Sequence, residues 1–267
     1  MILESCIVQS LVTGRSQQGK VLAKEKRKML MLWTLACFKG EVEDSVVDTE
    51  ATEITYPTAE SVLLYQGHGG MSGDQSGNGG WRNAAEAITS QYGFAVEERS
   101  SLGNLSQFRT VFMISPGQKE DVVLGANAVA DVQAGLDAGT RLVIMAGQDN
   151  CDGRAINTLL EDLGAPMRLT GKVATAPVLT DPGSGLQMSK DIDEGVLLST
   201  PCLVETNGAD VVLFETREIY AASWRGGWGG DVVLIGDHRF ADDTGKLGNR
   251  DNLQFVFNLV EVDPDFE

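Results

Sequence analysis

Residues 140–160 read TRLVIMAGQDNCDGRAINTLL, and this stretch decides the fold. The apolar run 142–146 is too short for a helix and rich in aliphatic residues, which is typical of a strand buried on both faces. Gly147 ends the run, and turn-forming residues follow it. Apolar residues recur at helical spacing over 154–163, where Asp152 is expected to cap a helix. A strand, a tight turn and a helix predict an α/β protein whose chemistry lies at the carboxyl ends of its strands.

The same alternation extends toward the N-terminus. Each expected strand is a short apolar run, and each expected helix carries apolar residues on one side. Strands are predicted over 61–66, 94–98 and 110–115, and helices over 81–92 and 121–138. This order predicts a three-layer, mostly parallel sheet of the flavodoxin-like kind, with helices on both faces.

The rhythm changes after residue 164. Short strands are expected over 167–170, 173–178, 195–199 and 203–205, separated by Gly, Pro and Asp. Residues 210–215 and 219–223 read as an antiparallel pair, 231–235 as the last core strand and 252–262 as a closing helix. The sequence therefore predicts a short antiparallel excursion before the parallel sheet is completed.

Charge and motif content exclude several classes of partner. The formal net charge is −17, which argues against nucleic acid because phosphate binding needs clustered Lys and Arg. The four cysteines form no CxxC pair or Cys/His cluster, so no structural zinc or other metal site is expected. The glycine-rich loop after the first strand matches neither a dinucleotide fingerprint nor a phosphate-binding P-loop, and no cofactor is predicted.

The N-terminal segment 1–37 has the pattern of an export signal. A basic run at 24–28 precedes eight apolar residues, 29–36, which are too few to span a bilayer. The Ala36–Cys37 junction resembles a bacterial lipoprotein signal, which implies lipidation of Cys37 and a lipid-anchored or periplasmic location in the cell envelope. The alternative is a short amphipathic helix with a buried cysteine in a cytoplasmic protein.

The chain then divides into a tether and a folded domain. Residues 38–60 are dense in Asp, Glu and Thr and poor in apolar residues, which predicts an acidic flexible tether. Residues 61–267 are expected to form the α/β domain. If the protein is exported, its membrane contact would be through the lipid anchor alone.

Three phrases carry a family resemblance over about residues 61–262. They are the loop GHGGMSGDQSGNGG after the first strand, VIMAGQDN followed by INTLLEDLG, and VVLIGDHRF with the later GNRDNLQFVFNLV. Together they resemble the class I glutamine amidotransferase-like superfamily, and more narrowly its branches in envelope and gliding-associated proteins. The resemblance implies an amidotransferase-like fold. It also implies a nucleophilic cysteine on the turn after the central strand and a histidine after a later strand.

No cysteine occurs on the turn where the resemblance implies the nucleophile. The turn reads Gly147-Gln148-Asp149, while Cys151 lies at the entry to the helix and His238 follows the last core strand. One interpretation is a Cys151 thiolate activated by the helix N-terminus and by His238. The other is a small turn residue, or one half of a disulfide with Cys202 in an oxidising compartment.

The candidate ligand-binding residues lie where strands are expected to end. Gly67 and His68 sit in a loop that could bring backbone N–H groups to an anion, Gln148 and Asp149 form the central turn, and Asp237 precedes His238. The alternatives are an ordinary flexible loop, and an Asp that bonds backbone. Trp224 and Trp228 could stack on a sugar or cover the sheet edge.

The function favoured by these features is a non-catalytic ligand- or partner-binding domain of an exported bacterial lipoprotein. Its partner would be a small molecule or an envelope protein. The alternative is a Cys/His-dependent hydrolase or amidotransferase that acts on amide or sugar material of the cell envelope, with Cys151 and His238 as its catalytic residues.

Overall fold

The computed structural model describes residues 59–70, 80–118, 122–244 and 246–261. The described residues all belong to one compact unit, Thr52–Glu267. The signal-like segment, Cys37 and all but the last two residues of the predicted tether lie outside the described residues. Among the described helices, none is both long and apolar enough to cross a membrane.

A nine-stranded sheet organises the domain, in the order β2-β1-β3-β4-β11-β10-β9-β6-β7. The first five strands are mutually parallel. They are β1 (Ser61–Tyr65), β2 (Ala95–Arg99), β3 (Thr110–Ile114), β4 (Arg141–Met145) and β11 (Val232–Ile235). Because the chain goes from β1 outward to β2 and then returns to β3 on the other side of β1, the strand order reverses between β1 and β3, as in flavodoxin-like sheets.

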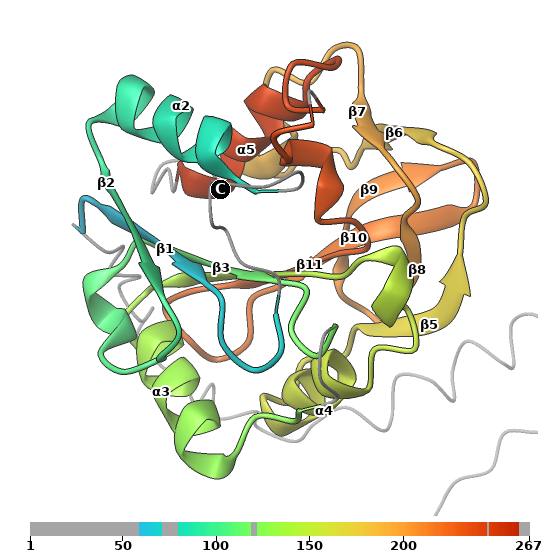
Figure 1. The fold of residues 1–267 in the computed structure, drawn as a ribbon. Coiled ribbons are helices and arrows are strands. Elements are labelled where there is room, and N and C mark those ends of the chain that lie inside the picture. Colours follow the sequence, from blue (N-terminus) through green and yellow to red (C-terminus); the bar gives the residue numbers. More distant parts are fainter. Residues whose placement is uncertain (1–58, 71–79, 119–121, 245, 262–267) are drawn as a thin grey trace, which may run out of the picture. The chain divides into compact units, whose positions relative to one another are not determined.

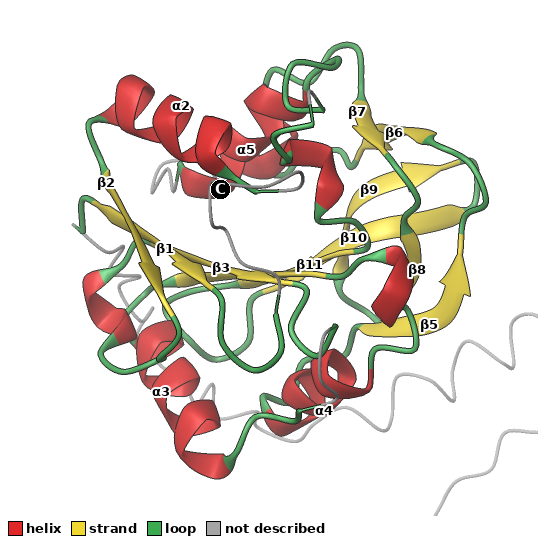
Figure 2. Cartoon of the chain, in the orientation of Figure 1, coloured by secondary structure: helices red, strands yellow, loops and turns green. Residues whose placement is uncertain are grey.

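The remaining strands form the antiparallel half. They are β10 (Glu218–Trp224), β9 (Asp210–Glu215), β6 (Val178–Pro182) and β7 (Val196–Leu198). A separate antiparallel pair is formed by β5 (Arg168–Val173) and β8 (Cys202–Glu205), and Figure 2 shows this pair beside the β9 and β10 end of the sheet.

Helices cover both faces of the parallel half. Figure 1 shows α2 (Arg82–Tyr92) and α5 (Asn252–Val260) on one face, and α3 (Ala126–Asp137) and α4 (Arg154–Asp162) on the other. Alternate residues of each central strand enter two separate cores. Leu63 and Val111 pack in the core beneath α3 and α4, and Leu64 and Phe112 in the core beneath α2 and α5. The predicted three-layer α/β fold, mostly parallel with an antiparallel excursion, is confirmed.

Three local predictions were wrong. Residues 174–177 link β5 to β6 instead of forming the strand expected over 173–178. The helix expected over 121–138 is α3, which begins only at Ala126. Gly125, its N-cap, has an extended backbone. Asp152 is exposed and does not cap α4. The N-cap is Gly153, whose φ of 59° lies in the left-handed region and whose close approach to Leu169 leaves no room for a Cβ.

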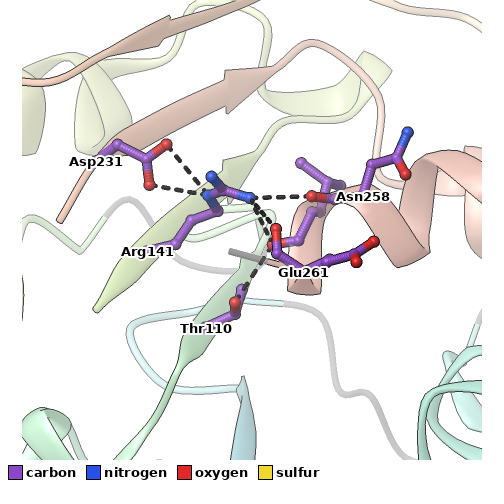
Figure 3. A network of polar contacts seen from close by, with 6 residues as sticks. Thr110, Arg141, Asp231, Asn258 and Glu261 are labelled. Carbon is purple, nitrogen blue, oxygen red and sulfur yellow. Dashed lines mark hydrogen bonds and ion pairs between the residues drawn. The ribbon is translucent and has the colours of Figure 1, made fainter. Parts of the chain in front are cut away.

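A buried ion pair closes the amino end of the parallel half (Figure 3). Arg141, 3% exposed, starts β4, and its Nε donates to Oδ1 of Asp231 at 2.8 Å. Its Nη1 donates to the carbonyl oxygens of Asn258, Leu259 and Glu261 at 3.0, 3.2 and 3.3 Å. These carbonyls lie at the C-terminal end of α5, where a helix leaves acceptors unpaired and favours a cation. Arg141 therefore ties two parallel strands to the helix that covers them.

Asn252 closes the outer edge of the antiparallel half. Its Oδ1 accepts a hydrogen bond from the backbone N–H of Leu197 in β7 at 2.8 Å, and its Nδ2 donates to the Leu197 carbonyl at 3.0 Å. The same Nδ2 lies 2.7 Å from the carbonyl oxygen of Phe240. One buried amide thus takes the place of a further strand and joins β7 to the first turn of α5.

Candidate functional site

The candidate site lies at the carboxyl ends of β1, β3, β4 and β11. Four loops begin there, at residues 66–70, 115–118, 147–150 and 236–238. Open α/β sheets bind ligands at this edge, beside the point where the strand order reverses. We call these four loops, together with Thr200, the carboxyl-edge loops.

Hydrogen bonds tie the carboxyl-edge loops to one another. The backbone N–H of Gly117 donates to the carbonyl of His68 at 2.9 Å. Gln118 Nε2 donates to Asp149 Oδ2 at 3.1 Å, and Thr200 Oγ1 donates to Gln148 Oε1 at 3.0 Å. The structure therefore brings the sequence-predicted residues His68, Gln148 and Asp149 to one edge, with Gln148 and Asp149 exposed.

His68 is held by the last residue of β1. The Tyr65 hydroxyl is hydrogen-bonded to His68 Nδ1, and burial raises the pKa of Tyr65 to about 12. Desolvation lowers the pKa of His68 below its ordinary value, which favours the neutral imidazole at pH 7. Only glycine fits at position 67, because the Cβ of any other residue would collide with the Tyr65 ring.

His238 is a buried structural donor. It is 1% exposed, and its Nδ1 lies 3.1 Å from the carbonyl oxygen of Ala146 and 3.1 Å from Ser115 Oγ. A carbonyl only accepts, so Nδ1 must carry the hydrogen. Burial lowers the pKa of His238, although the Asp237 carboxylate opposes that shift. The imidazole is therefore neutral, and Nδ1 cannot take a proton from a nucleophile.

Cys151 and Cys202 form a disulfide across 51 residues of sequence. Cys151 ends the short helix η2 (Gln148–Asn150), Cys202 begins β8, and both side chains are buried. In this oxidised state neither sulfur is a thiolate, so the Cys151 and His238 pair cannot perform nucleophilic catalysis. The sequence left the pairing open, and only the approach of β8 to the turn after β4 decides it.

Gly147 is the first residue of the turn where the family resemblance implies a nucleophile. A Cβ on Gly147 would lie 2.6 Å from Nδ1 and Cε1 of His238 and 3.1 Å from Ser115 Oγ. The imidazole thus fills the space that a nucleophilic side chain would need. Asn150 holds this turn, because its Oδ1 accepts from the Gly147 N–H at 2.7 Å and its Nδ2 donates to the Pro116 carbonyl at 3.2 Å.

Asp237 is turned inward. It is 1% exposed, its Oδ2 accepts from the backbone N–H of Ser199, and its Oδ1 accepts from the N–H of Arg239 at 2.9 Å. Both oxygens therefore accept hydrogen bonds from backbone N–H groups. This agrees with the alternative interpretation, in which Asp237 stabilises the loop instead of binding a ligand. Within the described ranges, no group of three or more His, Cys, Asp or Glu is arranged to hold a metal ion.

Sequence reasoning missed Ser115. This residue follows β3 directly, is fully buried, and has a φ of 49° in the left-handed region, which is uncommon for a side chain other than Gly, Asn or Asp. Its contact with His238 suggests a serine nucleophile at first sight. The hydrogen on His238 Nδ1 excludes that role, because this nitrogen donates to Ala146 and is not a base. The only sequence signal was the Pro116-Gly117 turn after it.

The tryptophans lie away from these loops, with Trp224 at the end of β10 and Trp228 on the turn before β11. Trp224 and Trp228 meet edge to face, with ring centroids 5.1 Å apart. Both are half-buried and pack on the core beneath α3 and α4. This favours the interpretation in which the pair covers the end of the sheet.

Comparisons with known proteins support the fold. No protein-family model matches the sequence, and no curated protein matches it. Among solved structures, the mmIFT52 N-terminal domain matches with a TM-score of 0.57 at 13% identity, over 75% of this chain and 95% of that one. Cytoplasmic protein STM3548 from Salmonella typhimurium matches with a TM-score of 0.54 at 10% identity, over 75% and 97% of the two chains.

A thuA-like protein from Bacteroides uniformis is also similar, with a TM-score of 0.43 at 12% identity, over 77% of this chain and 94% of that chain. That score is too low to support an argument about relationship. At the identities of the other two, the likeness establishes the α/β fold alone.

Proposed function

We propose that the domain is a non-catalytic binding module of the amidotransferase-like kind, which holds a small molecule or an envelope protein at the carboxyl-edge loops. The Cys151–Cys202 disulfide carries the proposal, because it consumes both of the cysteines that lie beside the Gly147 carbonyl oxygen. The position itself is a glycine against the His238 ring. A fold that keeps the sheet and has neither a free thiol nor an accepting Nδ1 at this turn is suited to binding.

The exposed groups at this edge define what could be recognised. His68 offers a half-buried ring nitrogen, and Gln148 and Asp149 offer an exposed amide and carboxylate. Of the other three predicted residues, Asp237 and His238 support the loops from within, and Gly67 makes room for the Tyr65 ring. A polar ligand that hydrogen-bonds to His68 and donates to Asp149 would match this arrangement.

Export to the bacterial cell envelope is the second part of the proposal. Disulfides persist in oxidising compartments and are rare in the cytosol. A disulfide between two buried cysteines supports a location outside the cytoplasm, which agrees with the lipoprotein-like junction at Cys37. We therefore place the domain on a lipid anchor, or free in the periplasm.

Thiol mapping tests the loss of catalysis. The chain is isolated without reductant, treated with iodoacetamide, digested and examined by mass spectrometry. We expect Cys151 and Cys202 in one disulfide-linked peptide, and alkylation of both only after reduction. Rapid alkylation of Cys151 that His238→Asn slows would instead establish the hydrolase or amidotransferase alternative.

Metabolic labelling with a palmitate analogue tests export separately. We expect label on the wild-type chain and none on Cys37→Ser. A Cys6→Ser variant is the matched control and should label like wild type. Absence of label on the wild-type chain would refute the lipid anchor while leaving the thiol result unaffected.

A further inference from the structure

A second cavity lies at the hairpin of β9 and β10, in the antiparallel half. Its volume is about 480 Å³, which is within the usual range of small-molecule sites. It is lined by the hairpin and by the loop after β6, and it shares no residue with the carboxyl-edge loops. The binding function proposed above does not use it.

One wall of this cavity is apolar. Phe214 in β9 and Ile219 in β10 are paired in register, so their side chains point to the same face of the hairpin. Both line the cavity and are half-buried, as is Leu186 on the opposite side. Covering these side chains with an apolar ligand would remove further surface from water, at roughly 25 cal/mol per Å².

The opposite wall is fixed by backbone contacts. The N–H of Gly183 donates to the carbonyl oxygen of Val212 at 2.7 Å, which anchors the loop after β6 on β9. A Cβ at Gly183 would collide with the Val211 carbonyl, so the two backbones are already in close contact. The cavity is therefore preformed, and a ligand need not order its walls.

Arg217 supplies a cation at the hairpin turn. It is exposed and lines the cavity, and among the described residues its guanidinium makes no ion pair or hydrogen bond. Two carboxylates, Glu215 and Glu218, adjoin Arg217 in the hairpin. Glu215 accepts from Thr216 Oγ1 at 3.2 Å, Glu218 accepts from the Tyr220 hydroxyl at 2.6 Å, and both line a different cavity.

The carboxylate of this cavity stands far from the cation. Asp210 lies at the start of β9, five residues before the end of the strand, which corresponds to about 17 Å of extended chain. Asp210 therefore stands at the opposite end of β9 from the turn that carries Arg217.

From this arrangement we infer that the cavity binds a small amphipathic carboxylate. The apolar body, aromatic or aliphatic, lies against Phe214 and Ile219, and the carboxylate pairs with the Arg217 guanidinium, whose fork of N–H donors suits a bidentate acceptor. The chain is strongly acidic overall, so the local cation and the apolar wall together select the ligand. A polar anion would leave the apolar wall uncovered, and a neutral hydrocarbon would leave the Arg217 guanidinium unpaired.

Titration with 4-phenylbutyrate, followed by ¹⁵N–¹H correlation spectra of the full chain, tests this site. We expect shifts in residues 183–186 and 210–219. The uncharged analogue 4-phenylbutanamide should bind about tenfold more weakly, as expected for loss of a charge-assisted hydrogen bond. Equal affinity for acid and amide would overturn the proposal, as would shifts confined to the carboxyl-edge loops or no shifts at all.

Variants identify the cation. Arg217→Gln should weaken phenylbutyrate binding about tenfold and leave amide binding unchanged. Arg82→Gln, on the remote helix α2, removes an exposed arginine of the same charge and should have no effect. If both variants weaken binding equally, the attraction is due to net charge alone and the site is refuted. The amide comparison on wild-type protein stands even where a variant perturbs the fold.

Discussion

The parallel and antiparallel halves of the sheet use their polar groups differently. In the parallel half, Arg141 and Asp231 neutralise one another at the amino end, while His238 and Asp237 bond backbone at the carboxyl end. In the antiparallel half, Arg217 has no partner among the described residues, and Leu179 of β6 is 43% exposed. The comparison teaches that polar residues at the carboxyl edge of an α/β sheet can serve the fold itself, because their side chains bond to the backbone of neighbouring loops.

The largest effect is expected at the amino end of the parallel half. Arg141→Met should lower the free energy of unfolding by about 3–5 kcal/mol, because it leaves the buried Asp231 carboxylate and the α5 carbonyls without a donor. Urea denaturation would measure this. Arg82→Met, which removes only an exposed i,i+4 pair with Glu86, should cause no measurable change. Equal losses in the two variants would contradict the role given to the buried network.

The edge of the antiparallel half should be the next most sensitive. Asn252→Leu keeps the volume but removes the partners of the Leu197 N–H and of the Phe240 carbonyl, which should cost about 2–3 kcal/mol. Asn127→Leu in the first turn of α3 is exposed and serves as the control, with a change within about 0.5 kcal/mol. Denaturant titration of both variants compares them directly, and a loss no greater at 252 than at 127 would show that β7 does not depend on this amide.

A substitution at the empty nucleophile position sharpens the contrast at the carboxyl edge. Gly147→Ala should destabilise by about 1–3 kcal/mol, because the new Cβ must displace the His238 ring. Gly103→Ala has nothing within 4 Å of the added Cβ and should be near neutral. Thermal unfolding monitored by circular dichroism measures both. A neutral Gly147→Ala would mean that the imidazole does not occupy this space.

The smallest effect concerns pH. Burial lowers the pKa of His238 in the folded state below its ordinary 6.5, so below about pH 6.5 the unfolded chain binds a proton that the folded chain does not. The free energy of unfolding should therefore fall as the pH drops below 6.5, by at most about 1.4 kcal/mol per pH unit, and be independent of this group above pH 7. His68 acts in the same direction.

The His238→Asn variant isolates this contribution. Denaturation between pH 7.5 and pH 5 should show a shallower pH dependence in the variant than in wild type, since His68 and the carboxylates titrate in both. An unchanged slope would mean that His238 is protonated as readily in the folded state as in the unfolded state.

Much of the parallel half was predictable from local sequence. Strands such as β3 and β4 are buried on both faces, so they appear as uninterrupted apolar runs that few other structures produce. The antiparallel half was harder, because its strands are short and half-exposed. Residues 173–178 read VATAPV, a short and mostly apolar run that resembles a strand, although residues 174–177 only connect β5 to β6.

The candidate site was likewise predictable only where it depends on local sequence. The turn Gln148-Asp149 could be placed at the strand edge because glycine and turn formers follow an apolar run directly. The contact of Ser115 with His238 joins residues 123 apart, and the Arg217 cavity depends on the pairing of Phe214 with Ile219 and on a loop from β6. No local sequence pattern predicts contacts between residues so far apart in the chain.

The sequence by itself determined the α/β layering, the order of the central elements and the absence of a cysteine from the turn after β4, since these depend on local periodicity and residue identity. Only the tertiary structure decided that Cys151 pairs with Cys202, that His238 donates to a backbone carbonyl, and that Arg217 stands beside an apolar wall. The physical reason is that a side chain's protonation, partners and exposure depend on which distant segments pack against it.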